Sequence, residues 1–261
     1  MPDSASLVFS LEAGIATIRL NRPDVFNSIN KPLALALQQR LRECKEDATV
    51  RAVLLTGTGK AFCAGQDLAE ITNPSSPGVS EIVEQHYNPV VQLIRELDKP
   101  VVAAVNGVAA GAGANIALAC DLVVAKESAS FIQAFSKIGL IPDSGGTYFL
   151  PRLIGMQRAT ALMMTGDKVS ATEAVQMGMI YKAIPDETFD SEVVALVVKL
   201  AAMPTKGLAY TKQLLNASFQ NTLEQQLRCE ADYQYRAGHT ADYREGVSAF
   251  MEKRKPTFTG E

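Results

Sequence analysis

Several residue types with distinctive chemistry are scarce or missing in this chain of 261 residues, which has no tryptophan, four cysteines and two histidines. Because His86 and His239 are the only histidines, we expect neither a histidine metal site nor a Ser-His-Asp triad. The cysteines are widely spaced and include no Cys-x-x-Cys pair. This usage is typical of reduced thiols, so a cytoplasmic location is expected.

Long apolar runs and a strong excess of one charge are also missing. No apolar run reaches the 18 residues of a membrane span, and the N-terminus lacks the pattern of a secretory signal. The net charge is −3, with 47% hydrophobic and 20% charged residues, which is ordinary for a soluble globular protein. We therefore expect neither nucleic acid nor a membrane as a partner.

Short apolar runs alternate with helical patterns along the first part of the chain. The expected strands cover residues 7–11, 15–20, 52–56, 101–105 and 122–125. The first two flank Ala13-Gly14 and predict a hairpin, and the others are β-branched and apolar, as buried strands are. Helices are expected over 32–46, with Asn30 as the cap, and over 80–97 and 111–120. The alternation predicts an α/β fold with a largely parallel sheet.

The pattern becomes helical after Pro151. The segment Ser170–Glu173 forms a capping box before a short helix that ends near Gly178. Further helices are expected over residues 191–203, 205–218, 222–236 and 241–253. We divide the chain into an α/β core, residues 1–195, and a C-terminal helical region, residues 196–261. Residues 73–78 (NPSSPG) are expected to form a flexible loop.

Three segments carry the residues of chemical interest. Ala61–Leu68 and Asn106–Asn115 are rich in glycine and alanine, and Ile141–Thr147 holds one acid, Asp143. The glycines of the second segment suit either close approach of a ligand to a helix N-terminus or close helix–strand packing. Their spacing fits neither a dinucleotide fingerprint nor a P-loop. Taken alone, Asp143 is typical of a surface turn.

Together, in this order, the segments resemble the enoyl-CoA hydratase/isomerase (crotonase) superfamily. The resemblance spans essentially the whole chain, from Leu20-Asn21-Arg22-Pro23 to Arg244–Arg254. It implies a crotonase-like spiral of ββα units in the core, with a C-terminal region that covers the site and forms trimers, often paired into hexamers. The implied ligand is an acyl-CoA thioester, with no cofactor besides the CoA of the substrate.

The resemblance also implies the site residues. The backbone N–H groups of Gln66 and Ala112 would form an oxyanion hole for the thioester oxygen, and Asp143 would be the catalytic residue. The residues expected to contact acyl-CoA are Ala64, Gly65, Gln66, Asp67, Leu68, Ala112 and Phe135. A wall made of Phe135, Ile138 and Ile141 would raise the pKa of Asp143 by desolvation.

Departures from the family pattern narrow the reaction. Hydratases of this family carry two glutamates, where this chain has Asn115 and Phe135, so hydration is not expected. The segments Ser130–Thr147, His86–Val90 and Ala241–Gly246 resemble the phenylacetate-pathway isomerases, which convert ring-1,2-epoxyphenylacetyl-CoA to oxepin-CoA. We therefore expect an acyl-CoA isomerase that uses one acid for proton transfer.

Three alternatives stay open at this point. The first is a Δ3,Δ2-enoyl-CoA isomerase of general fatty-acid type, and the second is an aryl-CoA dehalogenase, although that enzyme has tryptophan at the position of Phe135. The third is a non-catalytic binding member of the fold.

The roles of two further groups of residues also stay open. His86 and Tyr87 either face the acyl pocket or pack structurally, and Lys253–Lys255 either bind CoA phosphates or form a solvated tail.

Overall fold

The computed structural model describes residues 6–72 and 77–261. Residues 73–76 of the expected flexible loop lie outside the described residues.

The larger of two sheets has six strands in the order β1-β2-β3-β5-β7-β10. β1 (Leu7–Glu12) and β2 (Ile15–Leu20) form the expected antiparallel hairpin. Its turn residues, Ala13 and Gly14, both have positive φ (48° and 77°), as a two-residue hairpin turn requires. The parallel part of the sheet continues through β3 (Ala52–Gly57), β5 (Val101–Val105), β7 (Leu122–Lys126) and β10 (Lys182–Ile184). The expected parallel sheet is confirmed.

A second sheet, of four strands, is built from segments that the sequence did not reveal. Its strands, in spatial order, are β4 (Ala61–Cys63), β6 (Val108–Ala110), β8 (Ser130–Ile132) and β9 (Lys168–Ser170). Each strand has three residues, too few to display a two-residue period. Successive pairs, β3 with β4, β5 with β6 and β7 with β8, contribute one strand to each sheet, which generates a ββα spiral.

The helices largely follow the expected segments. α1 (Lys31–Glu46) is capped by Asn30, whose side chain accepts from the Leu33 N–H at 3.1 Å. The segment 80–97 is one helical path in three parts: α3 (Val79–Ile82), a π-helical turn (Val83–Tyr87) and α4 (Asn88–Glu96). The remaining helices of the core are α2 (Leu68–Ile71), α5 (Ala112–Leu118), α6 (Gly146–Ile154), α7 (Met156–Thr165) and α8 (Ala171–Gln176).

The expectation of a purely helical pattern after Pro151 was wrong. Both β9 and β10 follow this residue, and Pro151 itself lies inside α6 rather than before the first helix. The capping box before α8 is confirmed, because Ser170 and Glu173 bond each other's backbone N–H groups.

Helices pack on both faces of the large sheet. One face packs with α1, α4 and α5 in the main core, and α9 (Phe189–Ala201) covers the other face with Phe189, Val193 and Val197. The expected boundary between residues 195 and 196 falls inside α9, whose residues on both sides of that point pack on the same sheet.

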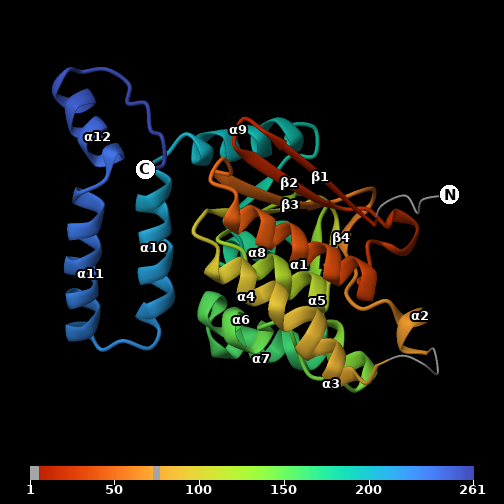
Figure 1. Cartoon of the computed structure of the whole chain (residues 1–261). Coiled ribbons are helices and arrows are strands. Elements are labelled where there is room, and N and C mark those ends of the chain that lie inside the picture. Colours follow the sequence, from red (N-terminus) through yellow and green to blue (C-terminus); the bar gives the residue numbers. More distant parts are fainter. Residues whose placement is uncertain (1–5, 73–76) are drawn as a thin grey trace.

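The chain leaves the core after α9 and forms α10 (Thr205–Ser218), α11 (Leu223–Gly238) and α12 (Ala241–Met251), which project to one side (Figure 1). The Lys212 ammonium anchors α10 through an ion pair of 2.8 Å with Asp121, which also pairs with Arg95 at 3.0 Å. In the described part of the chain no single helix is long and apolar enough to cross a membrane. Only α9 and α10 together meet that test of length and composition, and they are bent by 99°.

Candidate active site

The small sheet brings the three segments of interest to one edge. Its strands β4, β6 and β8 run parallel, so the chain leaves all three at the same end. The turn at Gly65 lies directly beside the start of α5. A Cβ atom added at Gly65 would lie 3.0 Å from the carbonyl oxygen of Ala110 and 3.4 Å from the nitrogen of Ala112.

Two backbone N–H groups border this meeting point. The carbonyl of Gly65 accepts from the Ile29 N–H at 2.7 Å, and the Asp67 N–H donates to the Ile29 carbonyl at 2.9 Å. Because C=O and N–H point in opposite directions in a trans peptide, the Gln66 N–H points away from Ile29. Ala112 is the first residue of α5, where backbone N–H groups have no partner within the helix.

For the glycines between residues 106 and 115 the sequence left two functions open, close packing and close approach of a ligand. Different glycines serve each of them. A Cβ atom at Gly107 would lie 2.1 Å from the carbonyl oxygen of Lys60, and one at Gly113 would lie 2.4 Å from that of Cys63. These two glycines therefore permit close packing. Gly111 instead adopts φ of +52° and faces Phe135, whose ring lies 3.8 Å from the position of an added Cβ.

These segments enclose a cavity of about 190 Å³. Its lining is apolar except for three side chains, those of Gln66, Tyr87 and Asp143. The other lining residues are Ala64, Gly65, Leu68, Ile71, Val79, Ile82, Val83, Gly111, Ala112, Ala134, Phe135, Ile138 and Leu140. Asp143 is the one carboxylic acid among the described residues that line the cavity.

Asp143 is a carboxylic acid in a largely buried setting. Burial raises the pKa of Asp143 to about 6, although the Ser144 hydroxyl donates to its Oδ1 at 2.9 Å and opposes this rise. Ser144 is buried with φ of 51°, and Gly145 follows with φ of 75°. This pair of left-handed residues turns the chain from the acid into α6.

Asn115 holds the loop that carries this acid. Its side chain is fully buried; Nδ2 donates to the backbone carbonyl of Asp143 at 2.9 Å, and Oδ1 accepts from Nε2 of Gln133 at 2.8 Å. At a position where the resemblance implies a glutamate in hydratases, this chain therefore has a side chain that fixes the loop.

Two residues singled out from the sequence, Asp67 and Ile141, do not line the cavity. The carboxylate of Asp67 pairs with Arg22 at 2.8 Å and accepts from the Ala69 N–H at 3.0 Å, which caps α2. Ile141 is 82% exposed, and Leu140 contributes to the cavity wall in its place. The expectation that Ile141 forms part of the wall was wrong, because the loop leaves this side chain exposed. The expected contact of Asp67 with acyl-CoA stays a prediction.

The turn after Arg22 is bonded to the start of β4 through the side chain of Asn27. The side chain of Asn27 is fully buried, donates to the carbonyls of Thr58 at 2.9 Å and Ala61 at 2.8 Å, and accepts from the Arg22 N–H at 2.8 Å. Its φ of 56° places it in the left-handed region, which asparagine tolerates better than most residues. Asn27 was not predicted from the sequence; its position after Arg22-Pro23 is the signal that was available.

The sequence left open whether His86 and Tyr87 face the acyl pocket or pack structurally, and the two residues differ in this respect. Tyr87 lines the cavity and its hydroxyl donates to Oε1 of Gln66, whereas His86 is buried outside the lining. Burial and then the negative charge of Asp143 raise the pKa of Tyr87, which keeps the hydroxyl protonated as a donor. Burial lowers the pKa of His86.

In the C-terminal segment, Arg254 pairs with Glu245 and Glu252, at 2.6 Å each.

No cluster of three or more His, Cys, Asp or Glu side chains that could hold a metal occurs within residues 6–72 and 77–261.

The family model described as enoyl-CoA hydratase/isomerase matches residues 10–261. The chain belongs to this family of enzymes. It is 49% identical over 255 residues to the 1,2-epoxyphenylacetyl-CoA isomerase of Escherichia coli K12, covering 96% of this chain and 97% of that protein. It is 35% identical over 263 residues to the trans-2-decenoyl-[acyl-carrier-protein] isomerase of Streptococcus mutans, covering 99% and 100%.

A solved structure agrees with the fold. The enoyl-CoA hydratase of Bacillus anthracis superimposes with a TM-score of 0.94 at 35% identity, covering 98% of this chain and all of that one. The crotonase-like α/β fold with C-terminal helices is therefore confirmed.

Proposed function

We propose that the chain is an acyl-CoA isomerase in which Asp143 transfers the proton. The observation that carries this proposal is a single carboxylic acid, of pKa about 6, in a mostly apolar cavity beside two backbone N–H groups. A base of this pKa is largely ionised at neutral pH and is still a better proton acceptor than an ordinary aspartate.

The proposed reaction begins with the thioester oxygen bound by the N–H groups of Gln66 and Ala112. These donors stabilise the enolate that forms when the Asp143 carboxylate takes a proton from the α carbon. The protonated Asp143 then returns the same proton to another carbon of the acyl group. No atom is gained or lost, so one acid serves both steps and no water is consumed.

The proposed substrate is ring-1,2-epoxyphenylacetyl-CoA, with oxepin-CoA as the product. The similarity to the isomerase of Escherichia coli supports this choice, and so does a lining that combines Phe135 with aliphatic side chains. In this reaction the carbon–carbon bond shared by the epoxide and the six-membered ring breaks, which gives the seven-membered oxepin ring. The proton that leaves the α carbon returns to a carbon of this expanded ring. A cavity of about 190 Å³ suits the acyl end alone, with the CoA portion outside along Ala64–Leu68.

Substitution of the acid tests the proposal directly. The Asp143→Asn variant keeps the size and shape of the side chain but cannot accept a proton, so turnover should fall by at least about 100-fold. Affinity for phenylacetyl-CoA, measured by calorimetry, should stay close to that of the wild type. Full turnover by this variant would rule Asp143 out as the base.

A second candidate is a Δ3,Δ2-enoyl-CoA isomerase, favoured by the similarity to the decenoyl isomerase of Streptococcus mutans. The same acid and amides would serve it, because a double-bond shift also needs only one proton moved between two carbons. Parallel assays with ring-epoxide and 3-enoyl thioesters separate the two candidates. Equal or faster turnover of the aliphatic thioester would favour the second.

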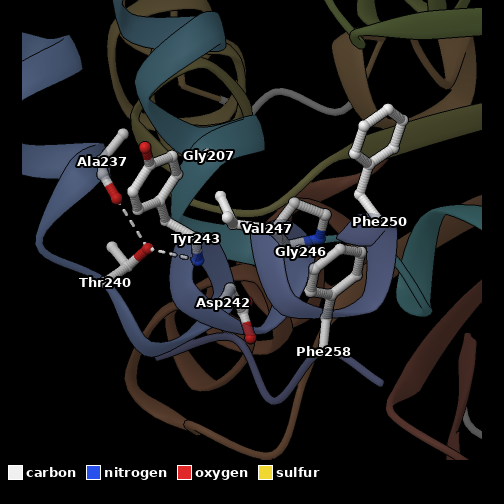
Figure 2. A pocket seen from close by; sticks show the side chains of 10 residues that line it. Gly207, Ala237, Thr240, Asp242, Tyr243, Gly246, Val247, Phe250 and Phe258 are labelled. Carbon is white, nitrogen blue, oxygen red and sulfur yellow. Dashed lines mark hydrogen bonds between the residues drawn. The ribbon is translucent and has the colours of Figure 1, made fainter. Parts of the chain in front are cut away.

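We further propose that α10–α12 bind other copies of the chain, as a trimer or a dimer of trimers. No residue of α11 is buried, and its Leu223 is 76% exposed, as Phe250 of α12 is 82% exposed. A pocket of about 490 Å³ is lined in part by Val247, Phe250 and Phe258 (Figure 2). Sedimentation at micromolar concentration should report a trimer or a hexamer; a monomer would exclude this assembly.

A further inference from the structure

The side chain of Gln66 is held at both ends. Its Oε1 accepts from the Tyr87 hydroxyl, and its Nε2 donates to Oε2 of Glu70 at 2.8 Å. Glu70 in turn accepts from the Lys31 N–H at 2.7 Å, at the first residue of α1. A glutamine that only had to expose its backbone would not need such restraint, so these contacts point to a requirement for its position.

The backbone before Gln66 explains that requirement. Gly65 has φ of +92°, and glycine lacks the side chain that would otherwise limit rotation. The bond from Ile29 to the Gly65 carbonyl fixes this peptide from the α1 side. Tyr87 lies in the cavity lining and restrains the side chain of the same residue through its hydroxyl.

Tyr87 is itself placed by an irregular piece of helix. It is the last residue of the π-helical turn Val83–Tyr87, it is 2% exposed, and α4 begins at the next residue. A π-helical turn inserts an extra residue and rotates the residues that follow, and such turns are frequent at functional sites. The buried ring leaves the hydroxyl little freedom to leave Gln66.

We propose that Tyr87 is a positioning residue, which holds Gln66 so that its backbone N–H stays directed at the thioester oxygen. The inference rests on the proposed isomerase function and adds a residue that acts through the amide donor rather than on the substrate.

Two variants separate positioning from packing. Tyr87→Phe keeps the ring and removes the hydroxyl, whereas Gln66→Leu keeps the backbone N–H and removes the acceptor. Each should lower kcat about 10-fold to 100-fold, the range expected for a displaced or weakened oxyanion donor, with KM little changed. The double variant should be no slower than the slower single variant, because Gln66→Leu already removes the contact that Tyr87→Phe breaks. The Tyr181→Phe variant changes a tyrosine that is 63% exposed and does not line the cavity, and it should match the wild type.

The infrared carbonyl frequency of bound phenylacetyl-CoA, with 13C at the thioester carbonyl, gives a readout independent of turnover. The wild type should lower this frequency on binding, and Tyr87→Phe should lower it less. A full shift and full kcat in Tyr87→Phe, or multiplying effects in the double variant, would overturn the inference. If Asp143→Asn still turned over while Tyr87→Phe reduced the shift, the proposed function would fail and the positioning role would stand.

Discussion

The Asn115 side chain donates a hydrogen bond of 2.9 Å to the backbone carbonyl of Asp143, and so ties the interior of α5 to the loop that carries the acid. The same amide accepts from Gln133. Because Ala112 begins α5, one short helix supplies both an amide donor and the support of the acid. A single buried side chain thus links the two parts of the site.

Replacing Asn115 should loosen this arrangement. Asn115→Leu leaves the Asp143 carbonyl and the Gln133 amide without their partner, which should cost about 1–3 kcal/mol of stability and lower kcat. Urea denaturation and steady-state kinetics would measure the two effects. Asn106→Ala is the control, since Asn106 bonds Gly57 and Gly59 rather than the acid loop. An equal loss of kcat in both variants would argue against a specific effect of Asn115.

The activity should depend on the ionisation of Asp143. Because burial raises the pKa of this acid to about 6 and the base must be ionised, kcat/KM should rise with pH through about 6 and then level off. An ordinary aspartate would place this rise near pH 4. Initial rates at substrate concentrations well below KM, measured across a series of buffers, check the position of this rise. A rise centred near pH 4 would contradict a desolvated acid.

The same burial should make Asp143 costly to the fold at neutral pH. Its folded pKa of about 6 lies above the ordinary value of 3.8, so the native state binds the extra proton. The stabilisation from this proton is complete below pH 4 and is lost as pH rises through 6. Asp143→Asn should therefore be more stable than the wild type at pH 7, by up to about 3 kcal/mol, with the difference shrinking at pH 4. Thermal melts at both pH values measure it, and a variant less stable than the wild type at pH 7 would contradict it.

The Ala112 N–H can be removed with little damage to its helix. Proline is well tolerated at the first position of a helix, which Ala112 occupies. Loss of this donor in Ala112→Pro should raise the barrier by about 2.7–4 kcal/mol, a drop in kcat of about 100-fold to 1,000-fold. The Ala112→Gly variant keeps the N–H and should lose far less. Similar rates for the two variants would show that this amide does not stabilise the transition state.

Much of the fold could be predicted from the sequence, because its larger elements have strong periodic signals. The hairpin at Ala13-Gly14, α1 with its Asn30 cap and the Ser170 capping box each combine a pattern with a specific local bond. The three-residue strands of the small sheet gave no such signal. They exist through pairing with distant segments, which a local pattern cannot report.

The residues of the candidate site could likewise be predicted only in part. Gln66, Ala112, Phe135 and Asp143 all line the cavity, as their sequence motifs suggested. Asp67 and Ile141 do not line it, because Asp67 forms a salt bridge with Arg22 and the loop leaves Ile141 exposed. The contribution of Tyr87 depends on a π-helical turn, a register change that leaves no mark in the hydrophobic pattern.

The pairing of β4 with β6 has a consequence for how such chains diversify. Neighbouring strands lie about 4.8 Å apart, so the backbone alone sets the separation of the two segments that end at Gln66 and Ala112. Mutations in these segments exchange side chains but leave that separation intact. The acid arrives on a different loop, after β8, where ionisable residues can be gained or lost separately. Evolution, or an engineer, can thus exchange one reaction for another while the same pair of amides is inherited unchanged.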